Sequence, residues 1–190
     1  MHTMRLKHRV SRIYWRGVGA IVVLMLLSSV TGVTAQHPEW MAYTTENSEL
    51  PANEVIELAF AQGILWIGTQ GGGLAKFNRE AWWMVYTMDN SKLPSNTIPA
   101  IAFDDRGKLW VGTGDGLSMF DHQTWYAFTT EKTDLPYHAI HALAVDARGM
   151  LWIGTGKFDD SGGGGLAALK RWKWAVYTTD NSDLPGDQIL

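Results

Sequence analysis

The chain has 190 residues, a formal net charge of −3 and no cysteine. The absence of cysteine excludes disulfides, thiolate metal sites and lipid attachment through a cysteine side chain. An acidic chain repels phosphate and releases no counterions from it, so nucleic acid is not expected among the partners.

Residues 1–35 have the layout of a secretory signal peptide. A basic start precedes an apolar run, and small residues at Val33 and Ala35 predict cleavage before Gln36. A retained membrane anchor is the alternative, but the strongly apolar part, residues 18–27, is shorter than the roughly 20 residues of a spanning helix. Cleavage would remove five basic and no acidic residues, leaving an exported chain, periplasmic or extracellular, with a net charge of about −8.

The remaining sequence, residues 36–190, is an internal repeat. Each unit opens on a tryptophan, and the units cover about 40–82, 83–124, 125–173 and, truncated, 174–190. A period of roughly 40 to 50 residues rich in Trp and Gly is typical of propeller blades. A helical solenoid would need amphipathic runs of about ten residues or more, and none occurs here.

Each complete unit predicts four short strands. In the first unit these are residues 55–60, 64–69, 73–77 and 83–87. Pro99 lies in the first strand of the second unit, which indicates an edge strand, and the innermost strand of a blade borders the central channel. Residues 40–44 have no blade of their own and are expected to be the fourth strand of a further blade. The predicted fold is all-β: an open, incomplete propeller with three complete four-stranded blades, an orphan N-terminal strand and the start of a fourth blade.

A tryptophan and a glycine recur in the second strand of every unit. We expect the tryptophans to fill the wedge between adjacent blades and the glycines to leave room for the rings; a carbohydrate or aromatic ligand site is the alternative for the tryptophans. These six repeat-core residues are Trp66, Trp110, Trp152, Gly68, Gly112 and Gly154.

The pattern "W-x-x-YTT-x-NS-x-LP-x-N-x-I … D-x-x-G-x-LWIGT-x-GGGL", carried by residues 98–117 and their counterparts 55–74 and 140–166, resembles the two-component regulator propeller repeat. The resemblance implies the extracytoplasmic sensing part of a bacterial histidine kinase, including hybrid sensors, that binds a ligand and is not catalytic in itself. Propellers need about four to eight blades, so the three blades here indicate an N-terminal fragment without a kinase core.

The loops that enter each blade and the loops between second and third strands should share one face, where propellers usually bind ligands. We expect a small molecule, glycan or peptide there. Polar residues at matching positions after each "LP" predict a circle at the channel mouth, although Asn and Asp at such places also bond nearby backbone amides. The candidate residues are Asn53, Asn96, His138 and Asp187 in the entering loops, and Asp115, Lys157, Phe158, Asp159 and Asp160 in the second set.

Other motifs give no catalytic, cofactor or metal site. Asp159 and Asp160 lack the alternating spacing of a calcium loop, and "GTGK" at 154–157 lacks the lead of a P-loop. His138 and His141, three apart on an extended run, point to opposite faces. Two alternatives to a sensor remain: a secreted interaction scaffold whose blades are completed by another chain, and, more weakly, a polysaccharide lyase using His138, His141 and Glu57.

Overall fold

A computed structural model of the chain describes residues 22–24, 41–78, 80, 82–157 and 163–189. Strands are the only regular secondary structure among these residues. No described segment forms a helix long and apolar enough to cross a membrane. Most of the predicted signal peptide lies outside the described residues. Its one described stretch is strand β1 (Val22–Leu24), which pairs antiparallel with β2 (Met41–Tyr43).

Twelve further strands form three four-stranded antiparallel sheets, one for each repeat. Blade 1 consists of β3 (Val55–Ala61), β4 (Ile64–Thr69), β5 (Leu74–Asn78) and β6 (Trp83–Tyr86). Blade 2 consists of β7 (Ala100–Phe103), β8 (Leu109–Thr113), β9 (Gly116–Phe120) and β10 (Trp125–Phe128). Blade 3 consists of β11 (Ile140–Val145), β12 (Leu151–Gly156), β13 (Gly164–Lys170) and β14 (Lys173–Tyr177).

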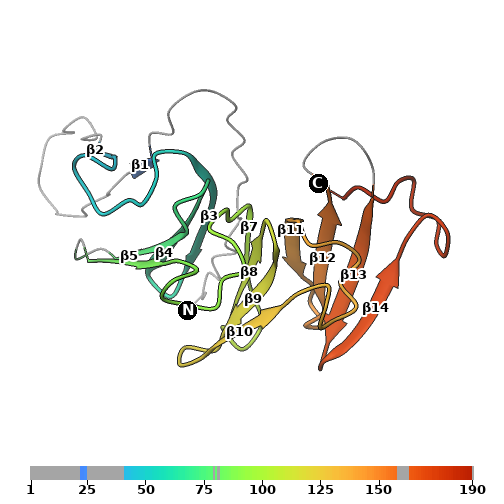
Figure 1. The fold of residues 1–190 in the computed structure, drawn as a ribbon. Helices are drawn as coiled ribbons and strands as arrows, with labels where there is room; N and C mark the ends of the chain where they lie inside the picture. The colour runs from blue at the N-terminus through green and yellow to red at the C-terminus, as the bar shows by residue number, and fades with distance from the viewer. Residues whose placement is uncertain (1–21, 25–40, 79, 81, 158–162, 190) are drawn as a thin grey trace, which may run out of the picture.

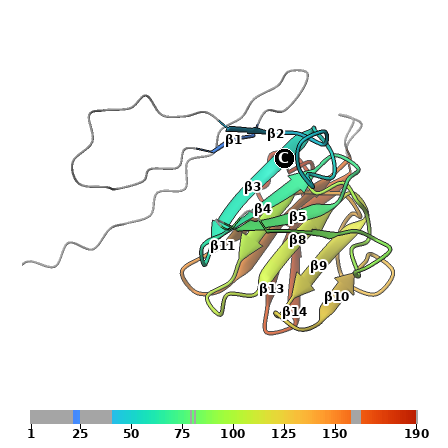
Figure 2. The ribbon, with the colours of Figure 1, turned by 90° about the vertical axis from the view of Figure 1, so that its left-hand side faces the viewer.

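The blades stand side by side in chain order (Figure 1), and a view from the blade 1 side shows that blade in front of the other two (Figure 2). In every sheet the strands pair in the order of the sequence. The first strands of neighbouring blades contact each other, β3 with β7 and β7 with β11, and the second strands β4 and β8 also contact the first strand of the next blade. The predicted all-β fold, with three blades in an open arrangement, is confirmed.

The first strand of blade 2 begins at Ala100, two residues later than predicted. Pro99 has no N–H for the ladder. The N–H of Ile98 donates instead to the carbonyl of Thr69 in blade 1, at 3.0 Å. The start of the predicted strand is therefore a link between blades rather than part of the sheet.

An isoleucine of the following unit packs against the repeated glycine of the second strand. A Cβ on Gly112 would lie 2.6 Å from Ile140 Cγ2, and one on Gly154 would lie 2.8 Å from Ile189 Cγ2. At Gly68 the added atom would overlap the carbonyl oxygen of Ile98. The room beside each glycine is thus taken by the isoleucine of the next unit and not, as expected, by the tryptophan ring.

The tryptophan of the second strand packs against the next blade wherever that blade is present. Trp66 is 5% exposed in a cluster with Ile101 and Leu109 of blade 2, and Trp110 is 6% exposed in a cluster with residues of blade 3. Trp152, on the far side of blade 3, is only partly buried. These rings therefore fill the wedges between blades, and the last of them faces a wedge that has no described neighbour.

An aromatic contact also repeats along the outer strands. Tyr86 of β6 lies on Phe120 and Trp125 of blade 2, with ring centroids 6.0 and 5.1 Å apart. Tyr43 of β2 makes the same kind of contact with Phe77 and Trp83 of blade 1, at 5.2 and 5.7 Å. Strand β2 therefore takes the place that the fourth strand of a preceding blade would have, as the sequence indicated.

Candidate functional site

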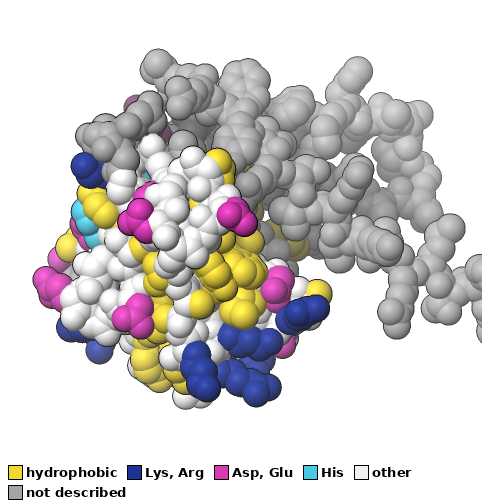
Figure 3. All heavy atoms as spheres, turned by 90° about the vertical axis from the view of Figure 1, so that its right-hand side faces the viewer, with side chains coloured by type: hydrophobic (Ala, Val, Ile, Leu, Met, Phe, Trp, Pro, Cys, Tyr) yellow, Lys and Arg dark blue, Asp and Glu magenta, His cyan; other side chains and the backbone are white. Residues whose placement is uncertain are grey.

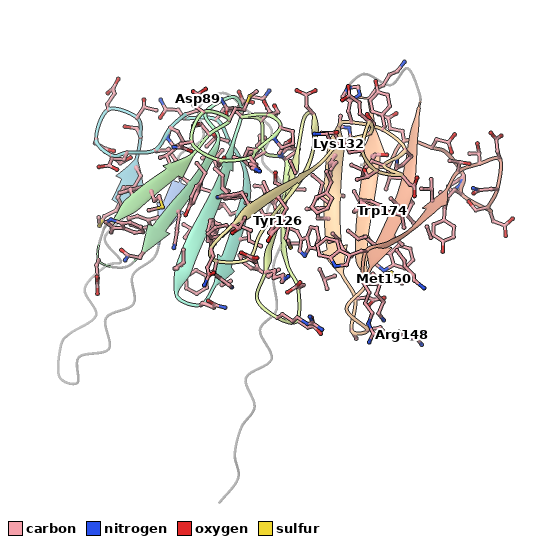
Figure 4. All side chains as sticks on the ribbon, turned by 60° about the horizontal axis from the view of Figure 1, so that its bottom comes forward. Asp89, Tyr126, Lys132, Arg148, Met150 and Trp174 are labelled. Atoms are coloured by element: carbon pink, nitrogen blue, oxygen red, sulfur yellow. The ribbon has the colours of Figure 1, made fainter. Side chains whose placement is uncertain are left out.

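Each sheet has two edges with different kinds of connection. The antiparallel order places the loops between second and third strands, together with the links between blades, at one edge, which we call the loop edge. The tight turns between first and second and between third and fourth strands lie at the opposite, hairpin edge. In Figure 4, Asp89 and Lys132 lie at the loop edge, whereas Arg148 and Met150 lie at the hairpin edge.

Three of the four residues in the predicted polar circle are bonded to the turn that precedes them. Asn53 Oδ1 accepts from the N–H of Thr45 at 2.8 Å. Asn96 Oδ1 and Asp187 Oδ1 accept in the same way from the N–H of Met88 and of Thr179, at 2.9 and 2.6 Å. These are the side chain to backbone hydrogen bonds that Asn and Asp commonly make in turns, the alternative to a ligand-binding role. A ligand would meet these side chains already oriented by the turn.

The fourth member of the circle, His138, is placed differently. It is exposed, and its ring lies against that of Tyr137 with centroids 4.1 Å apart. The neighbouring candidate His141 has its Nε2 3.1 Å from the carbonyl oxygen of Gly156, a hydrogen bond when that nitrogen carries the proton. The loop edge of blade 3 thus presents an imidazole where the other units present a bonded amide or carboxylate.

The candidates in the second set of loops are only partly placed. Asp115 is exposed, and its N–H donates to Thr113 Oγ1 at 3.2 Å. The carbonyl of Lys157 accepts from Gln188 Nε2 at 3.0 Å. Phe158, Asp159 and Asp160 lie outside the described residues. In the described part of the chain, no group of three or more His, Asp or Glu residues is arranged to hold a metal ion.

A buried threonine supports each of these loops and was not singled out from the sequence. The threonine that ends every "LWIGT" or "LWVGT" run is fully buried, and its hydroxyl donates to a glycine carbonyl where the third strand begins. The pairs are Thr69 with Gly73 at 2.7 Å, Thr113 with Gly116 at 2.8 Å and Thr155 with Gly165 at 2.9 Å. Its recurrence after the glycine in all three units is the signal that could have identified it.

The "NS" of the entering segment builds a turn with one side chain. Asn90 Oδ1 accepts from the N–H of Thr87 at 2.8 Å, and its Nδ2 donates to the carbonyl of Val85 at 3.0 Å. Asn47 and Asn181 repeat both bonds in their own units. In the third copy Lys132 stands at this position, and a lysine side chain has no acceptor to offer the turn.

This difference predicts opposite effects of two substitutions. Asn90→Ala should lower the free energy of unfolding by about 1 to 2 kcal/mol, because two hydrogen bonds are lost. Lys132→Asn should raise it by about 0.5 to 1 kcal/mol by restoring the side chain that the other turns use. Urea unfolding followed by circular dichroism measures both changes. A Lys132→Asn variant that is less stable than the unmodified chain would contradict this account of the turn.

At the hairpin edge an aspartate organises the first turn of blades 2 and 3. Asp146 Oδ1 accepts from the N–H of Arg148 and of Met150 at 2.8 and 2.9 Å, and Asp146 Oδ2 accepts from Trp152 Nε1 at 3.3 Å. The bond from Met150 above all keeps the pKa of Asp146 below its ordinary value. Asp104 in blade 2 makes the two equivalent backbone bonds, both at 2.9 Å.

In blade 2 the tryptophan side chain does not make the hydrogen bond to the aspartate that Trp152 makes in blade 3. Trp110 Nε1 is buried and has no hydrogen-bond partner, although Trp110 stands six residues after Asp104 as Trp152 does after Asp146. A buried donor left without an acceptor costs about 1 to 3 kcal/mol. The hairpin edge between blades 2 and 3 therefore contains an unsatisfied polar group.

The repeat matches a known family in two of its copies. Residues 92–115 and 134–157 match the family model described as "Two component regulator propeller". Each match runs from the entering segment through the inner strand to the end of the second strand. Two repeats of this chain therefore match the two-component regulator propeller family, as the sequence pattern predicted. No match was found among curated proteins.

Solved structures share the fold. The chain is 26% identical to the extracellular domain of BT3049 from B. thetaiotaomicron, described as a hybrid two component system, with a TM-score of 0.67 over 80% of this chain and 20% of that one. The extracellular domain of BT4673, of the same description and organism, is 20% identical with a TM-score of 0.61 over 81% of this chain and 21% of that one. A catalytically inactive virginiamycin B lyase from Staphylococcus aureus is 10% identical with a TM-score of 0.56, over 78% of this chain and 47% of that one.

The chain therefore spans about a fifth of the length of the first two structures. Below 25% identity, BT4673 and the lyase show likeness of fold alone. The region of BT3049 that matches this chain belongs to an extracellular domain.

Proposed function

We propose that this chain is an exported sensor segment of a bacterial two-component signalling protein, which binds a small molecule, glycan or peptide at its loop edge and catalyses no reaction itself. The observation that carries the proposal is the combination of the family match with 26% identity to an extracellular domain of a hybrid two component system. The export signal predicted from residues 1–35 agrees with it.

The loop edge suits a binding role because a rigid scaffold positions its polar groups. The turn bonds that orient Asn96 and Asp187, and the buried hydroxyl of Thr113, hold adjacent loops in defined positions. A ligand that bridges the loops of two blades would change how those blades pack. Since Ile140 sits directly against Gly112, such a change would be transmitted through a close contact between blades.

Titration calorimetry of the purified chain with panels of oligosaccharides and peptides tests the proposal. We expect saturable binding by one class, weakened about tenfold or more by Asp115→Ala, because that side chain is exposed at the loop edge. Gln123→Ala, at an exposed hairpin turn of the same blade, is the matched control and should leave binding unchanged. Heat that never saturates across both panels, or binding that Gln123→Ala weakens equally, would argue against a loop-edge site.

A second candidate, an interaction scaffold that completes its ring with another chain, is favoured by the free faces of the outer blades. Leu58 and Phe60 of blade 1 are 47% and 63% exposed. Phe60 has the position of Phe103, which in blade 2 lies 6.3 Å from the ring of Trp66. At the other end, hydrophobic side chains gather in the middle of the face that blade 3 presents (Figure 3).

This candidate predicts a discrete oligomer. Light scattering coupled to size-exclusion chromatography should give a single species of defined mass, because apolar faces of this kind associate. The variant Phe60→Asp should reduce that mass. A monomer at all concentrations would eliminate the scaffold and leave the sensor proposal standing.

A further inference from the structure

A cavity of about 190 Å³ lies between blades 2 and 3 at the hairpin edge, opposite the loop edge. Three turns contribute to its walls: the β7–β8 turn of blade 2 and the β11–β12 and β13–β14 turns of blade 3. The two blades therefore build the cavity together.

The rim of the cavity carries an excess of positive charge. Two carboxylates, Asp104 and Asp105, line it together with five cationic side chains: Arg106, Lys108, Arg148, Lys170 and Arg171. This local balance is opposite in sign to the net charge of −3 of the whole chain. Lys and Arg side chains also gather at the lower edge of the face in Figure 3. A concave site with a cationic rim attracts anions.

One of the two carboxylates is already engaged by the backbone. Asp104 Oδ1 accepts from the N–H groups of Arg106 and Lys108, both at 2.9 Å. A ligand carboxylate therefore meets guanidinium and ammonium groups with little competition from this oxygen. Arginine in particular offers paired donors that match the geometry of a carboxylate.

Apolar side chains form part of the wall of the cavity. Met119, Val145, Leu151 and Leu169 line it together with Trp110, whose Nε1 is buried and has no partner. Trp172 stands at the rim, 60% exposed, with its ring stacked on that of Phe128 at 5.9 Å and 25°. The cavity thus combines a cationic rim, apolar side chains in its wall and an exposed indole.

We propose that this cavity binds a small ring-bearing carboxylic acid, with the carboxylate at the basic rim and the ring against the Trp172 indole. An aromatic acid and a sugar acid share this chemistry. Binding at this edge is independent of a ligand at the loop edge, so each can be present without the other.

Calorimetric titration of the full chain with 4-hydroxybenzoate and with glucuronate tests the proposal and separates the two sources. The neutral counterparts, 4-hydroxybenzyl alcohol and glucose, measure how tightly the ring binds without a carboxylate. Inorganic sulfate measures how tightly an anion binds without a ring. We expect at least one acid to bind saturably, and its neutral counterpart and sulfate to bind about tenfold more weakly or worse. The acid that binds identifies the class of ligand.

Arg148→Gln and Arg171→Gln, each at the rim, should weaken the acid about tenfold, since each removes a charge-assisted contact. Lys132→Gln, at the opposite edge in Figure 4, removes the same charge and should leave binding unchanged. Matching thermal unfolding curves for the three variants confirm that they fold alike. The proposal is overturned if neither acid saturates, if a neutral counterpart or sulfate binds as tightly as the acid, or if Lys132→Gln weakens binding as much as the rim variants.

Discussion

Trp110→Ala is expected to lower the free energy of unfolding by about 3 to 5 kcal/mol, the usual cost of truncating a core aromatic side chain. The indole is 6% exposed and packs in one cluster with Leu117 of its own blade and Ile140, Leu143 and Ile153 of the next. Its removal would open a void between blades 2 and 3 that the two sheets cannot close. Urea unfolding followed by circular dichroism measures the change.

The repeat supplies a matched control for this substitution. Trp152 has the same position in blade 3 but is only partly buried, because no described blade covers it. Trp152→Ala should therefore cost clearly less, about 1 to 2 kcal/mol, since less apolar area is lost from the core. An equal decrease in the free energy of unfolding for the two variants would show that packing of Trp110 between blades is not the source of its contribution to stability.

Gly68→Ala is expected to cost about 3 kcal/mol or more, at or above the upper end of the usual range for overpacking. The added methyl would overlap the carbonyl oxygen of Ile98, a main-chain atom of the link to blade 2 that cannot rotate away. The same segment donates the N–H of Ile98 to Thr69, so a displacement would also strain a hydrogen bond between blades. Thermal and urea unfolding measure the loss.

Gly186→Ala is the control, because no heavy atom lies within 4 Å of a Cβ added there. Its effect on the free energy of unfolding should stay within about 1 kcal/mol and can be favourable, since alanine restricts the unfolded chain. A Gly68→Ala variant as stable as the Gly186→Ala variant would refute the close approach between blades 1 and 2.

The strands could be predicted because two local signals agree in every unit. Turn residues separate the apolar runs, and the repeat gives each run a counterpart, so that β4 occupies the predicted residues 64–69. The inner strand of blade 2 was misjudged at its start because Ile98 and Pro99 look like strand residues. Ile98 contacts blade 1 instead of the strand beside it. The hydrophobic pattern within a single repeat unit does not reveal contacts with the neighbouring unit.

The site was less accessible to sequence reasoning. Matching positions predicted the polar circle, but only the geometry shows that Asn53 and Asn96 are bonded to turns. The cavity at the hairpin edge left no pattern at all in the sequence. Its cationic side chains come from three separate turns, and the missing partner of Trp110 Nε1 becomes visible only beside the bonded Trp152.

The most direct test of the sensor assignment is to sequence the coding DNA beyond the codon for Leu190. The account predicts a reading frame that continues into further "LWIGT" repeats, enough to close a ring, and then into a membrane helix and a histidine kinase core. A stop codon directly after Leu190, or a frame that leads into an unrelated catalytic domain, would contradict it.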